Sequence, residues 1–327
     1  MKKIYSLLLT MIALGLCVSC NDEWKDEQFK HLISFKAPIN HQGVTPVYVR
    51  YKPDGKITYQ LPLLVSGSTD NDKNLTVHIA EDADTLNVLN QERFSTRTEL
   101  FYKQLGTQHY TRPETVNIPA GSNTALAPID LSLANLDMSD KWVLPLTIVD
   151  NPAYGYETNT HKDYSKALLR IFPFNDYSGE YGATTYKVYF AGSENEAIVP
   201  EYKTAYVVDE NTVFFYAGLV DEDYQDRKHY KIFVRFNDDN EKSLTITTDN
   251  PDIRLEVKGN PYYIIDEKMD EVLPYLNIVS VFLEFEYEYR DYTAVPEHEL
   301  HYIVKGSLTM ERRINIQIPD EDQAIQW

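Results

Sequence analysis

Cysteine is nearly absent from this sequence of 327 residues. Its two cysteines, Cys17 and Cys20, both lie close to the N-terminus, so the rest of the chain has neither disulfides nor thiol chemistry. Basic residues are also scarce, with 31 Lys and Arg against 50 Asp and Glu and a formal net charge of −19. Such a charge repels nucleic-acid phosphates and anionic lipid headgroups, and we therefore exclude nucleic acid as a partner.

Long apolar runs are missing as well, apart from one near the N-terminus. Lys2 and Lys3 precede the apolar stretch Ser6–Leu16, which is roughly half the ~20 residues that a membrane-spanning helix needs. Residues 1–19 are therefore predicted to be a signal peptide. The small residues before Cys20 resemble the lipobox of bacterial lipoproteins, which implies cleavage before Cys20 and acylation of its thiol. The alternative is an ordinary secretory signal with an incidental cysteine.

An acidic segment follows the predicted cleavage site. Residues 20–30 are predicted to be a polar tether, and they carry the acidic cluster Asp22, Glu23, Asp26 and Glu27. This cluster resembles the surface-export tag of lipoproteins in the Bacteroidota, and the alternative is a solvated linker. Removal of residues 1–19 would change the net charge to −21, because this segment contains Lys2 and Lys3 but no Asp or Glu. We predict a protein of the outer membrane that faces the cell exterior. Because its negative charge disfavours binding to anionic lipids, the acyl chains would be its membrane anchor.

Residues 31–173 have the pattern of an all-β domain. Short runs of β-branched and aromatic residues are separated by turn signals every 8–15 residues, as in Thr45–Tyr51, where Val47 and Val49 alternate with Tyr48 and Arg50. One helix is predicted at Asp84–Phe94, with Asp84 as a possible cap. About seven strands with one inserted helix indicate an immunoglobulin-like β-sandwich.

A Pro and Asn-Asp/Ser-Gly cluster at Pro173–Tyr181 predicts the boundary with a second domain, residues 174–327. Strands in this domain are longer and richer in tyrosine, of which the chain has 25. Ile278–Tyr289 alternates with a period of two. One face, predicted to pack on a core, carries Val281, Leu283, Phe285, Tyr287 and Tyr289, and the other, predicted to face solvent, carries Glu284, Glu286, Glu288 and Arg290. We predict an antiparallel meander that forms a lipocalin-like barrel or a sandwich, capped by a helical segment at Glu267–Leu276.

Established catalytic and metal-binding motifs are absent from the sequence. It has no phosphate-binding glycine loop, no Gly-x-Ser-x-Gly elbow and no zinc-protease motif. The ladder Glu284, Glu286 and Glu288 places carboxylates ~6–7 Å apart, but three on one wet strand face repel one another and stay ionised, unlike an acid/base pair. His298 and His301 lack an evident third ligand, and the acidic turns at residues 70–72 and 238–240 lack calcium-loop spacing. We therefore predict no catalysis, no metal and no cofactor.

Aromatic residues near predicted strand ends of the second domain suggest a glycan site instead. Sugar rings stack on exposed aromatic faces, while carboxylates, amides and guanidinium groups bind their hydroxyls. The candidate glycan-binding residues, which lie close together in sequence, are Tyr262, Tyr263, Tyr275, Tyr292, Arg290 and Asp291.

Three segments carry a further resemblance: Tyr51-Lys52-Pro53-Asp54-Gly55, Trp142-Val143-Leu144-Pro145-Leu146 and the closing Ile318–Trp327. With the lipobox and the acidic tag, the chain resembles two-domain surface lipoproteins of unknown-function families from Bacteroidota polysaccharide-utilisation (Sus-like) loci. The resemblance implies a glycan-binding partner of a TonB-dependent outer-membrane transporter and its companion lipoproteins. It carries over no binding residues. Similar N-terminal domains also precede chitinase-like endoglycosidases, but the Asp-x-x-Asp-x-Asp-x-Glu strand of those enzymes is absent here.

Three hypotheses of function remain open at this point. The first is a non-catalytic lipoprotein that binds a polysaccharide or oligosaccharide at the cell surface. The second is an assembly subunit that docks on an outer-membrane transporter and does not bind sugar. A large exposed apolar patch would favour this hypothesis. The third is a glycoside hydrolase that uses Glu284, Glu286 or Glu288.

Overall fold

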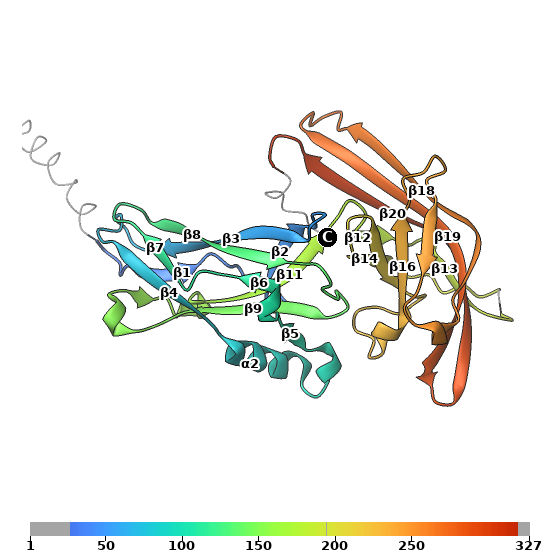
Figure 1. Ribbon diagram of the computed structural model, residues 1–327, viewed down its shortest axis with the longest axis horizontal. Helices are drawn as coiled ribbons and strands as arrows, with labels where there is room; N and C mark the ends of the chain where they lie inside the picture. The colour runs from blue at the N-terminus through green and yellow to red at the C-terminus, as the bar shows by residue number, and fades with distance from the viewer. Residues whose placement is uncertain (1–26, 194, 320–327) are drawn as a thin grey trace, which may run out of the picture.

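The structure, a computed structural model, describes residues 27–193 and 195–319. In this part of the chain, strands dominate and form two β domains that lie end to end (Figure 1). The predicted all-β class is confirmed. The predicted signal peptide and Cys20 lie outside the described residues. Short 3-10 segments lie at Thr98–Leu100, Thr107–His109, Pro152–Tyr154, His161–Asp163, Arg227–Tyr230 and Pro251–Ile253.

The first domain is a sandwich of two β-sheets. One sheet has the order β10 (Glu157–Thr158), β1 (Leu32–Phe35), β3 (Lys56–Val65), β8 (Thr124–Ser132) and β6 (Tyr110–Thr111). The other has the order β2 (Thr45–Arg50), β11 (Lys166–Phe174), β9 (Lys141–Ile148), β4 (Leu75–Glu81) and β7 (Thr115–Ile118), with β5 (Tyr102–Gln104) paired to β9. Most pairs are antiparallel, but β1–β10, β2–β11 and β5–β9 are parallel.

Aliphatic residues at alternate strand positions fill the space between these sheets. In β2, for example, Val47 and Val49 are buried while Tyr48 and Arg50 are half-exposed, as the period-two pattern predicts. Most other core residues are Leu, Ile and Val, and aromatic rings such as Phe35 are few. The sandwich therefore follows the rule of apolar residues inward and polar residues outward.

A helix on the outside of the sandwich begins one residue earlier than predicted. Helix α2 spans Ala83–Phe94, and its cap is Asp82, whose Oδ1 accepts a hydrogen bond from the Thr85 N–H at 3.1 Å. Asn90 on the helix bonds both backbone groups of Tyr102 in β5, at 2.9 and 2.8 Å. These bonds attach the helix to the second sheet.

The second domain is a curled antiparallel sheet. Its strand order is β17 (Leu244–Thr247), β16 (Lys231–Phe236), β15 (Thr212–Tyr216), β14 (Tyr202–Val207), β12 (Gly179–Gly182), β20 (His298–Asn315), β19 (Leu276–Val295) and β18 (Glu256–Met269), with β13 (Lys187–Phe190) paired to β20. A bridge between Ser243 and Tyr262 joins the two ends of this order, and the Tyr263 N–H donates to the Lys242 carbonyl at 2.9 Å. The sheet is thus a nearly closed up-and-down barrel, as the meander pattern predicts.

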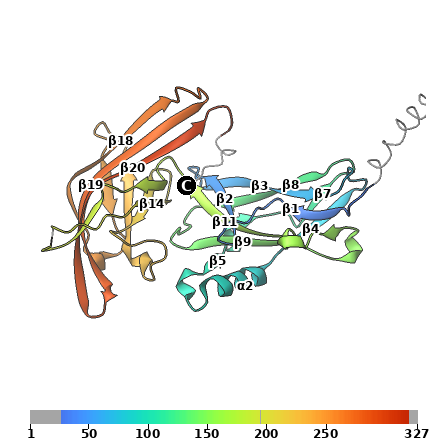
Figure 2. The ribbon, with the colours of Figure 1, turned by 180° about the vertical axis from the view of Figure 1, so that it is seen from behind.

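Strand β19 confirms the alternation seen in the sequence. Val281, Leu283, Phe285, Tyr287 and Tyr289 are buried as predicted, and Ile278 and Asp291 of the same strand are buried as well. The helix predicted at Glu267–Leu276 is wrong, because β18 continues to Met269 and pairs with Asn277 of β19. The turn between them is held by Asp270, whose Oδ1 accepts hydrogen bonds from the Val272 and Leu273 N–H groups. Strands β18–β20 extend past the shorter barrel strands (Figure 1 and Figure 2).

The described chain begins at the end of the sandwich that is distant from the barrel (Figure 1). Glu27, predicted to belong to a free tether, is instead bound to the loop after β3. Its carboxylate accepts hydrogen bonds from the Ser68 and Thr69 N–H groups at 2.8 and 2.9 Å, and His31 lies 2.6 Å away. Among the described residues, no helix is long and apolar enough to span a bilayer.

Candidate functional site

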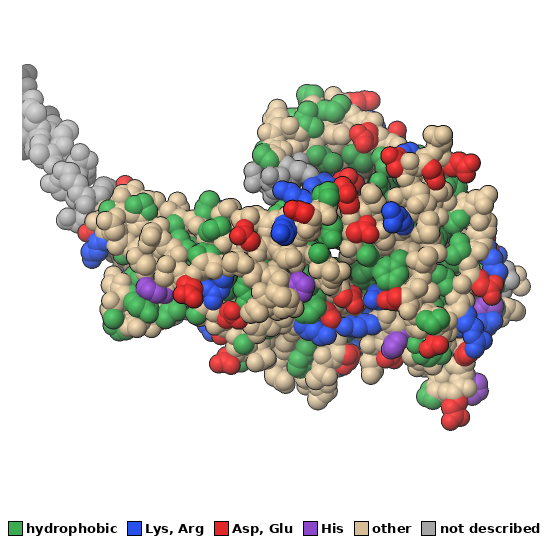
Figure 3. Space-filling model, in the orientation of Figure 1, with side chains coloured by type: hydrophobic (Ala, Val, Ile, Leu, Met, Phe, Trp, Pro, Cys, Tyr) green, Lys and Arg blue, Asp and Glu red, His purple; other side chains and the backbone are tan. Residues whose placement is uncertain are grey.

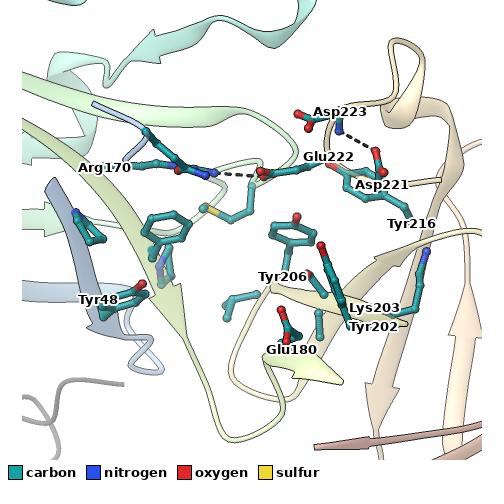
Figure 4. Close-up of a pocket in the computed structure, with 18 of the residues that line it drawn as sticks. Tyr48, Arg170, Glu180, Tyr202, Lys203, Tyr206, Tyr216, Asp221, Glu222 and Asp223 are labelled. Atoms are coloured by element: carbon teal, nitrogen blue, oxygen red, sulfur yellow. Dashed lines mark hydrogen bonds and ion pairs between the residues drawn. The ribbon is translucent and has the colours of Figure 1, made fainter. Parts of the chain in front are cut away.

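A cleft of about 500 Å³ lies where the sandwich meets the barrel. Charged side chains of both signs gather at this junction (Figure 3), and the close-up shows side chains from both domains pointing toward one another (Figure 4). The sandwich contributes chiefly Gln42, Tyr48, Met138, Arg170 and Phe172, and the barrel contributes Glu180, Tyr202, Thr204, Tyr206, Tyr216 and the loop Val220–Asp223.

Strands β2 and β11 build the sandwich wall of the cleft. Because they are parallel neighbours in register, Tyr48 lies directly beside Phe172, and the two rings stack with centroids 5.4 Å apart. Arg170 lies two residues before Phe172 and therefore on the same face, with its guanidinium 4.3 Å from the Phe172 ring. This wall combines aromatic faces with a fixed cation.

Strand β14 builds the opposite wall. Its burial alternates, so Lys203, Ala205 and Val207 face the barrel core while Tyr202 and Tyr206 face the cleft. Tyr202 is 54% exposed. The Tyr206 ring stacks on Phe214 at 5.0 Å, and desolvation, with the nearby negative charge of Glu222, raises its pKa well above the ordinary value. The Tyr206 phenol is therefore protonated at neutral pH and remains a hydrogen-bond donor.

The loop between β15 and β16 closes one side of the cleft. Arg170 donates to Gln42 Oε1 at 2.7 Å and to Glu222 Oε2 at 3.2 Å, so a salt bridge joins the two domains. Lys141 of the sandwich lies 3.6 Å from Glu222 and 3.2 Å from Asp223. A second hollow of about 390 Å³ lies beyond these residues and shares Gln42, Glu222 and Asp223 with the cleft.

Lys203 fixes this loop from inside the barrel. Its ammonium group is buried and donates to the Gly218 and Val220 carbonyls at 2.9 and 2.8 Å. Burial lowers the pKa of Lys203 to about 7, partly offset by the negative charge of Asp221. The loop that presents Asp221 and Glu222 to the cleft is thus attached to the barrel wall rather than free to move.

The junction between the domains is fixed in the same way. Strand β11 ends at Phe174, β12 begins at Gly179, and Asn175 between them accepts hydrogen bonds from the Tyr177 and Ser178 N–H groups. Arg312 of β20 donates to the Asn175 and Ser178 carbonyls at 2.8 and 2.5 Å. The two walls of the cleft therefore have a defined separation, which favours a preorganised site.

The predicted aromatic residues of β18 and the β18–β19 turn do not line this cleft. Tyr262 is half-buried in β18, where its hydroxyl donates to Glu284 Oε2 at 2.8 Å. Tyr263 is only 3% exposed, and its ring packs edge-on against Phe236 inside the barrel. Tyr275 lies just before β19 and is half-buried. Tyr263 therefore has little exposed surface to offer a ligand, because its ring packs in the barrel core.

The other three predicted residues lie at the far end of β19. Asp291 is buried, and its Oδ1 accepts hydrogen bonds from the Tyr230 hydroxyl at 2.6 Å and from two backbone N–H groups, so it is a structural acceptor. The Tyr292 hydroxyl accepts from Asn250, and Arg290 lies opposite His301. Since β19 rises about 3.3 Å per residue, Tyr275 and Arg290 are more than ~40 Å apart along the strand. The expected cluster does not form.

The carboxylate ladder lies on the outer face of the barrel. Glu284 accepts the hydrogen bond from Tyr262, Glu286 lies 3.5 Å from Lys305, and Glu288 lies 2.8 Å from His301. Among the described residues, no group of three or more His, Cys, Asp and Glu side chains has the arrangement of a metal site.

The sequence contains the cleft residues but no sign that they meet. Tyr48 and Phe172 are the outward residues of buried strands, which a period-two pattern identifies. Tyr202 and Tyr206 are equally recognisable as the outward residues of β14. Their meeting depends on how the domains pack, and that packing involves pairs between the domains such as Arg170–Glu222, which have no sequence signature.

Comparison with known proteins places the chain among Bacteroides proteins. Residues 24–152 match a domain of unknown function, DUF4973, and residues 165–309 match a family model for a C-terminal domain. A Bacteroides ovatus protein of unknown function is 46% identical, with a TM-score of 0.82 over 90% of this chain and 100% of that one. Another from the same species is 36% identical, with a TM-score of 0.82 over 93% and 98% of the two chains.

A third similar structure comes from Bacteroides thetaiotaomicron and is described as an auxiliary nutrient binding protein. It is 43% identical, with a TM-score of 0.80 over 91% of this chain and 100% of that one. No curated protein matches the chain. The chain therefore belongs to the family of two-domain Bacteroides proteins that these structures represent, with the DUF4973 domain at its N-terminus.

Proposed function

We propose that this protein is a non-catalytic surface lipoprotein that binds glycan in the cleft between its two domains and delivers it to a TonB-dependent uptake system. The observation that carries the proposal is the pairing of aromatic surface from both domains, Phe172 on one wall and Tyr202 and Tyr206 on the other, with carboxylates between them. This combination suits a sugar ring, which has apolar C–H faces and a rim of hydroxyls.

Two further observations support nutrient binding. A family member with 43% identity is described as an auxiliary nutrient binding protein. The fixed junction at Asn175 and the anchored loop at Lys203 hold the cleft open without a ligand, which reduces the ordering cost of binding.

Tethering by an acylated Cys20 completes the proposal. The described chain begins at Glu27, at the end of the sandwich away from the barrel, so a lipid at Cys20 would leave the cleft directed away from the membrane. Metabolic labelling with palmitate should mark the wild-type chain and not Cys20→Ala. Protease treatment of intact cells should remove the wild-type protein if it faces the exterior.

Affinity electrophoresis against a panel of plant, fungal and host polysaccharides tests the binding. We expect retardation on at least one polysaccharide, and at least tenfold weaker binding for Tyr202→Ala and Phe172→Ala because each loses a stacking face. Tyr262→Ala is the matched control, since Tyr262 is a partly exposed aromatic residue on the flank of the barrel. Loss of binding in Tyr262→Ala alone would place the site where the sequence suggested. Absence of retardation on every polysaccharide would contradict glycan binding.

Absence of catalysis is part of the same proposal. Glu284, Glu286 and Glu288 each contact a neighbouring side chain on the outside of the barrel, away from the cleft. Incubation with the retained polysaccharide should therefore release no oligosaccharide. Product formation that disappears in Glu286→Gln would support the hydrolase hypothesis instead.

The assembly hypothesis has one observation in its favour. Large apolar side chains are exposed on β18, in the β18–β19 turn and past the end of β20, among them Ile264, Met269, Val272 and Ile316. Val272 is 83% exposed. Co-purification of an outer-membrane transporter with the wild type, and not with Val272→Asp, would assign this turn to docking. Such a result is compatible with glycan binding in the cleft.

A further inference from the structure

The charged side chains that line the cleft differ in whether they are already paired within the protein or can interact with a ligand. Two cations, Arg170 and Lys203, and four carboxylates, Glu180, Asp221, Glu222 and Asp223, line it together with His41. The close-up shows the two cations and the four carboxylates on several sides of the same space (Figure 4). What a ligand meets depends on which of them are already engaged within the protein.

Both cations are engaged. The Arg170 guanidinium binds Gln42 and Glu222 and lies over the Phe172 ring, and the residue is only 5% exposed. Lys203 is 6% exposed and donates two hydrogen bonds to backbone carbonyls. Its lowered pKa, about 7, means that its positive charge is also partial at neutral pH. Neither cation is placed to neutralise an acidic group that enters the cleft.

Two of the carboxylates form no ion pair among the described residues. Glu222 and Asp223 form ion pairs with Arg170 and Lys141. In the part of the chain that the structure describes, by contrast, neither Glu180 nor Asp221 lies within salt-bridge distance of a basic side chain. Glu180 is exposed on β12, opposite Thr204 of the β14 wall. Asp221 acts on the nearby Lys203 charge, and its Oδ1 accepts a hydrogen bond from the Asp223 N–H at 2.9 Å. Among the described residues, Glu180 is therefore the cleft carboxylate whose negative charge is not offset by a cation.

We infer that the cleft selects a neutral glycan, one without uronic acid or sulfate groups; this inference rests on the proposed glycan binding. Hydroxyl groups of a neutral sugar donate to the Glu180 and Asp221 carboxylates, and such charge-assisted hydrogen bonds are the stronger kind. The ring faces pack on Phe172 and Tyr202. A carboxylate or sulfate on the ligand in the same position would be repelled by the Glu180 and Asp221 carboxylates, because water screens charge only partly in a cleft.

The geometry also excludes compensation by rearrangement. Turning Arg170 toward an acidic ligand would break its bonds to Glu222 and to Gln42 Oε1 and remove the salt bridge that joins the two domains. Moving Lys203 outward would remove the donor that holds the Gly218 and Val220 carbonyls. Each change costs interactions that stabilise the fold, so an acidic glycan gains little from it.

The experiment uses one polysaccharide in three chemical forms. A neutral polysaccharide that retards the full chain is oxidised at its primary hydroxyls to uronic acids, and part of the oxidised sample is then methyl-esterified. We expect at least tenfold weaker binding of the oxidised form and recovery on esterification, which removes the charge and keeps the added carbonyl. Glu180→Lys should bring the affinities for the oxidised and neutral forms at least tenfold closer together, whereas Glu284→Lys, on the outer face of the barrel, should leave their ratio unchanged.

The outcomes separate this inference from the proposal on which it rests. Equal or tighter binding of the oxidised form, or retardation only on acidic polysaccharides such as alginate, with loss in Tyr202→Ala, would overturn neutral selectivity and leave glycan binding intact. Retardation on no polysaccharide at all would overturn both. A binding ratio that Glu180→Lys does not change would also contradict the inference, because the selectivity would then have another source.

Discussion

The sandwich and the barrel fill their interiors with different chemistry. The sandwich core is almost entirely Leu, Ile and Val, whereas the barrel core is crowded with rings such as Tyr181, Phe215 and Tyr287. Two flat sheets packed face to face leave a thin space that branched aliphatic chains fill. A closed barrel encloses a wider space, and large aromatic side chains from facing strands are needed to reach its centre.

This difference has a consequence for hydrogen bonding. An aliphatic core carries no polar atoms, but every buried tyrosine brings a hydroxyl that needs a partner. In the barrel, the Tyr186 and Tyr287 hydroxyls lie 2.7 Å apart, and the Gly218 N–H donates to Tyr287 at 3.0 Å. The barrel is thus held by directional bonds as well as by packing, and the two domains should respond differently to substitution.

Truncation in the aliphatic core should have the largest effect. Leu61 is fully buried between the sheets, so Leu61→Ala should cost about 2–5 kcal/mol of unfolding free energy through lost burial and a residual cavity. Leu126→Ala is the control, because Leu126 on the adjacent β8 is 56% exposed and should change stability by less than about 0.5 kcal/mol. Chemical denaturation measures both. Similar values for the two variants would mean that the sandwich core is not the tightly packed one described.

Removal of one buried tyrosine hydroxyl from the barrel should have the next largest effect on the unfolding free energy, and the sandwich should be unaffected. Tyr287→Phe keeps the ring but leaves the Tyr186 hydroxyl and the Gly218 N–H without this partner, which should cost about 1–3 kcal/mol. Tyr202→Phe, at an exposed tyrosine, should be neutral. Hydrogen exchange should show a loss of amide protection in β15 and β19 and unchanged protection in the sandwich. A neutral Tyr287→Phe would show that packing alone holds the barrel.

The sequence was sufficient for much of this fold because both domains obey period-two burial. The alternation of Val47 and Val49, and of the long strand β19, confirms its predicted faces residue by residue. The segment Glu267–Leu276 was mispredicted because its local pattern is ambiguous, while pairing of Met269 with Asn277 and the Asp270 turn decides for a hairpin. Cross-strand partners far apart in sequence outweigh local propensity there.

The site was much less predictable than the fold. Tyrosines close in sequence, such as Tyr262 and Tyr263, alternate between the two faces of a strand, and Tyr275 and Tyr292 lie near opposite ends of β19. Residues far apart in sequence, such as Arg170 and Glu222, meet instead at 3.2 Å. Periodicity predicts which residues of a strand are buried and which are exposed. Contact between two domains depends on the complementarity of their surfaces, which a single sequence does not display.

The place where the two domains meet should show a smaller and salt-dependent effect. Glu222→Gln keeps a hydrogen-bond acceptor beside Arg170 but removes the charge that Arg170 and Lys141 share, which should cost about 1 kcal/mol. The loss should shrink in high salt. Glu157→Gln is the control, since its pair with Lys30 is largely solvent-exposed and should contribute almost nothing. Equal effects in the two variants would argue against a specific ionic latch between the domains.

The smallest effect should come from Glu27, which binds the first described residues to the loop after β3 of the sandwich. Hydrogen bonds, first from the Ser68 N–H and then from the Thr69 hydroxyl, hold the pKa of Glu27 well below its ordinary value. A lowered pKa means that the folded state prefers the ionised form. The stabilisation is therefore fully present above the unfolded pKa, near 4.5, and is lost as the pH falls toward the folded pKa.

Comparison of wild type with Glu27→Gln tests that sign. The difference in Tm between the two proteins should be constant from pH 6 to pH 8 and should diminish steadily below about pH 4.5, as the unfolded chain begins to bind the proton that the folded chain excludes. Glu92→Gln, on the exposed face of α2, serves as the control at each pH. A difference that grows toward acid would mean that the bonds to Ser68 and Thr69 stabilise the protonated carboxyl, and Glu27 would then be a polar contact rather than an ionic clamp on the sandwich.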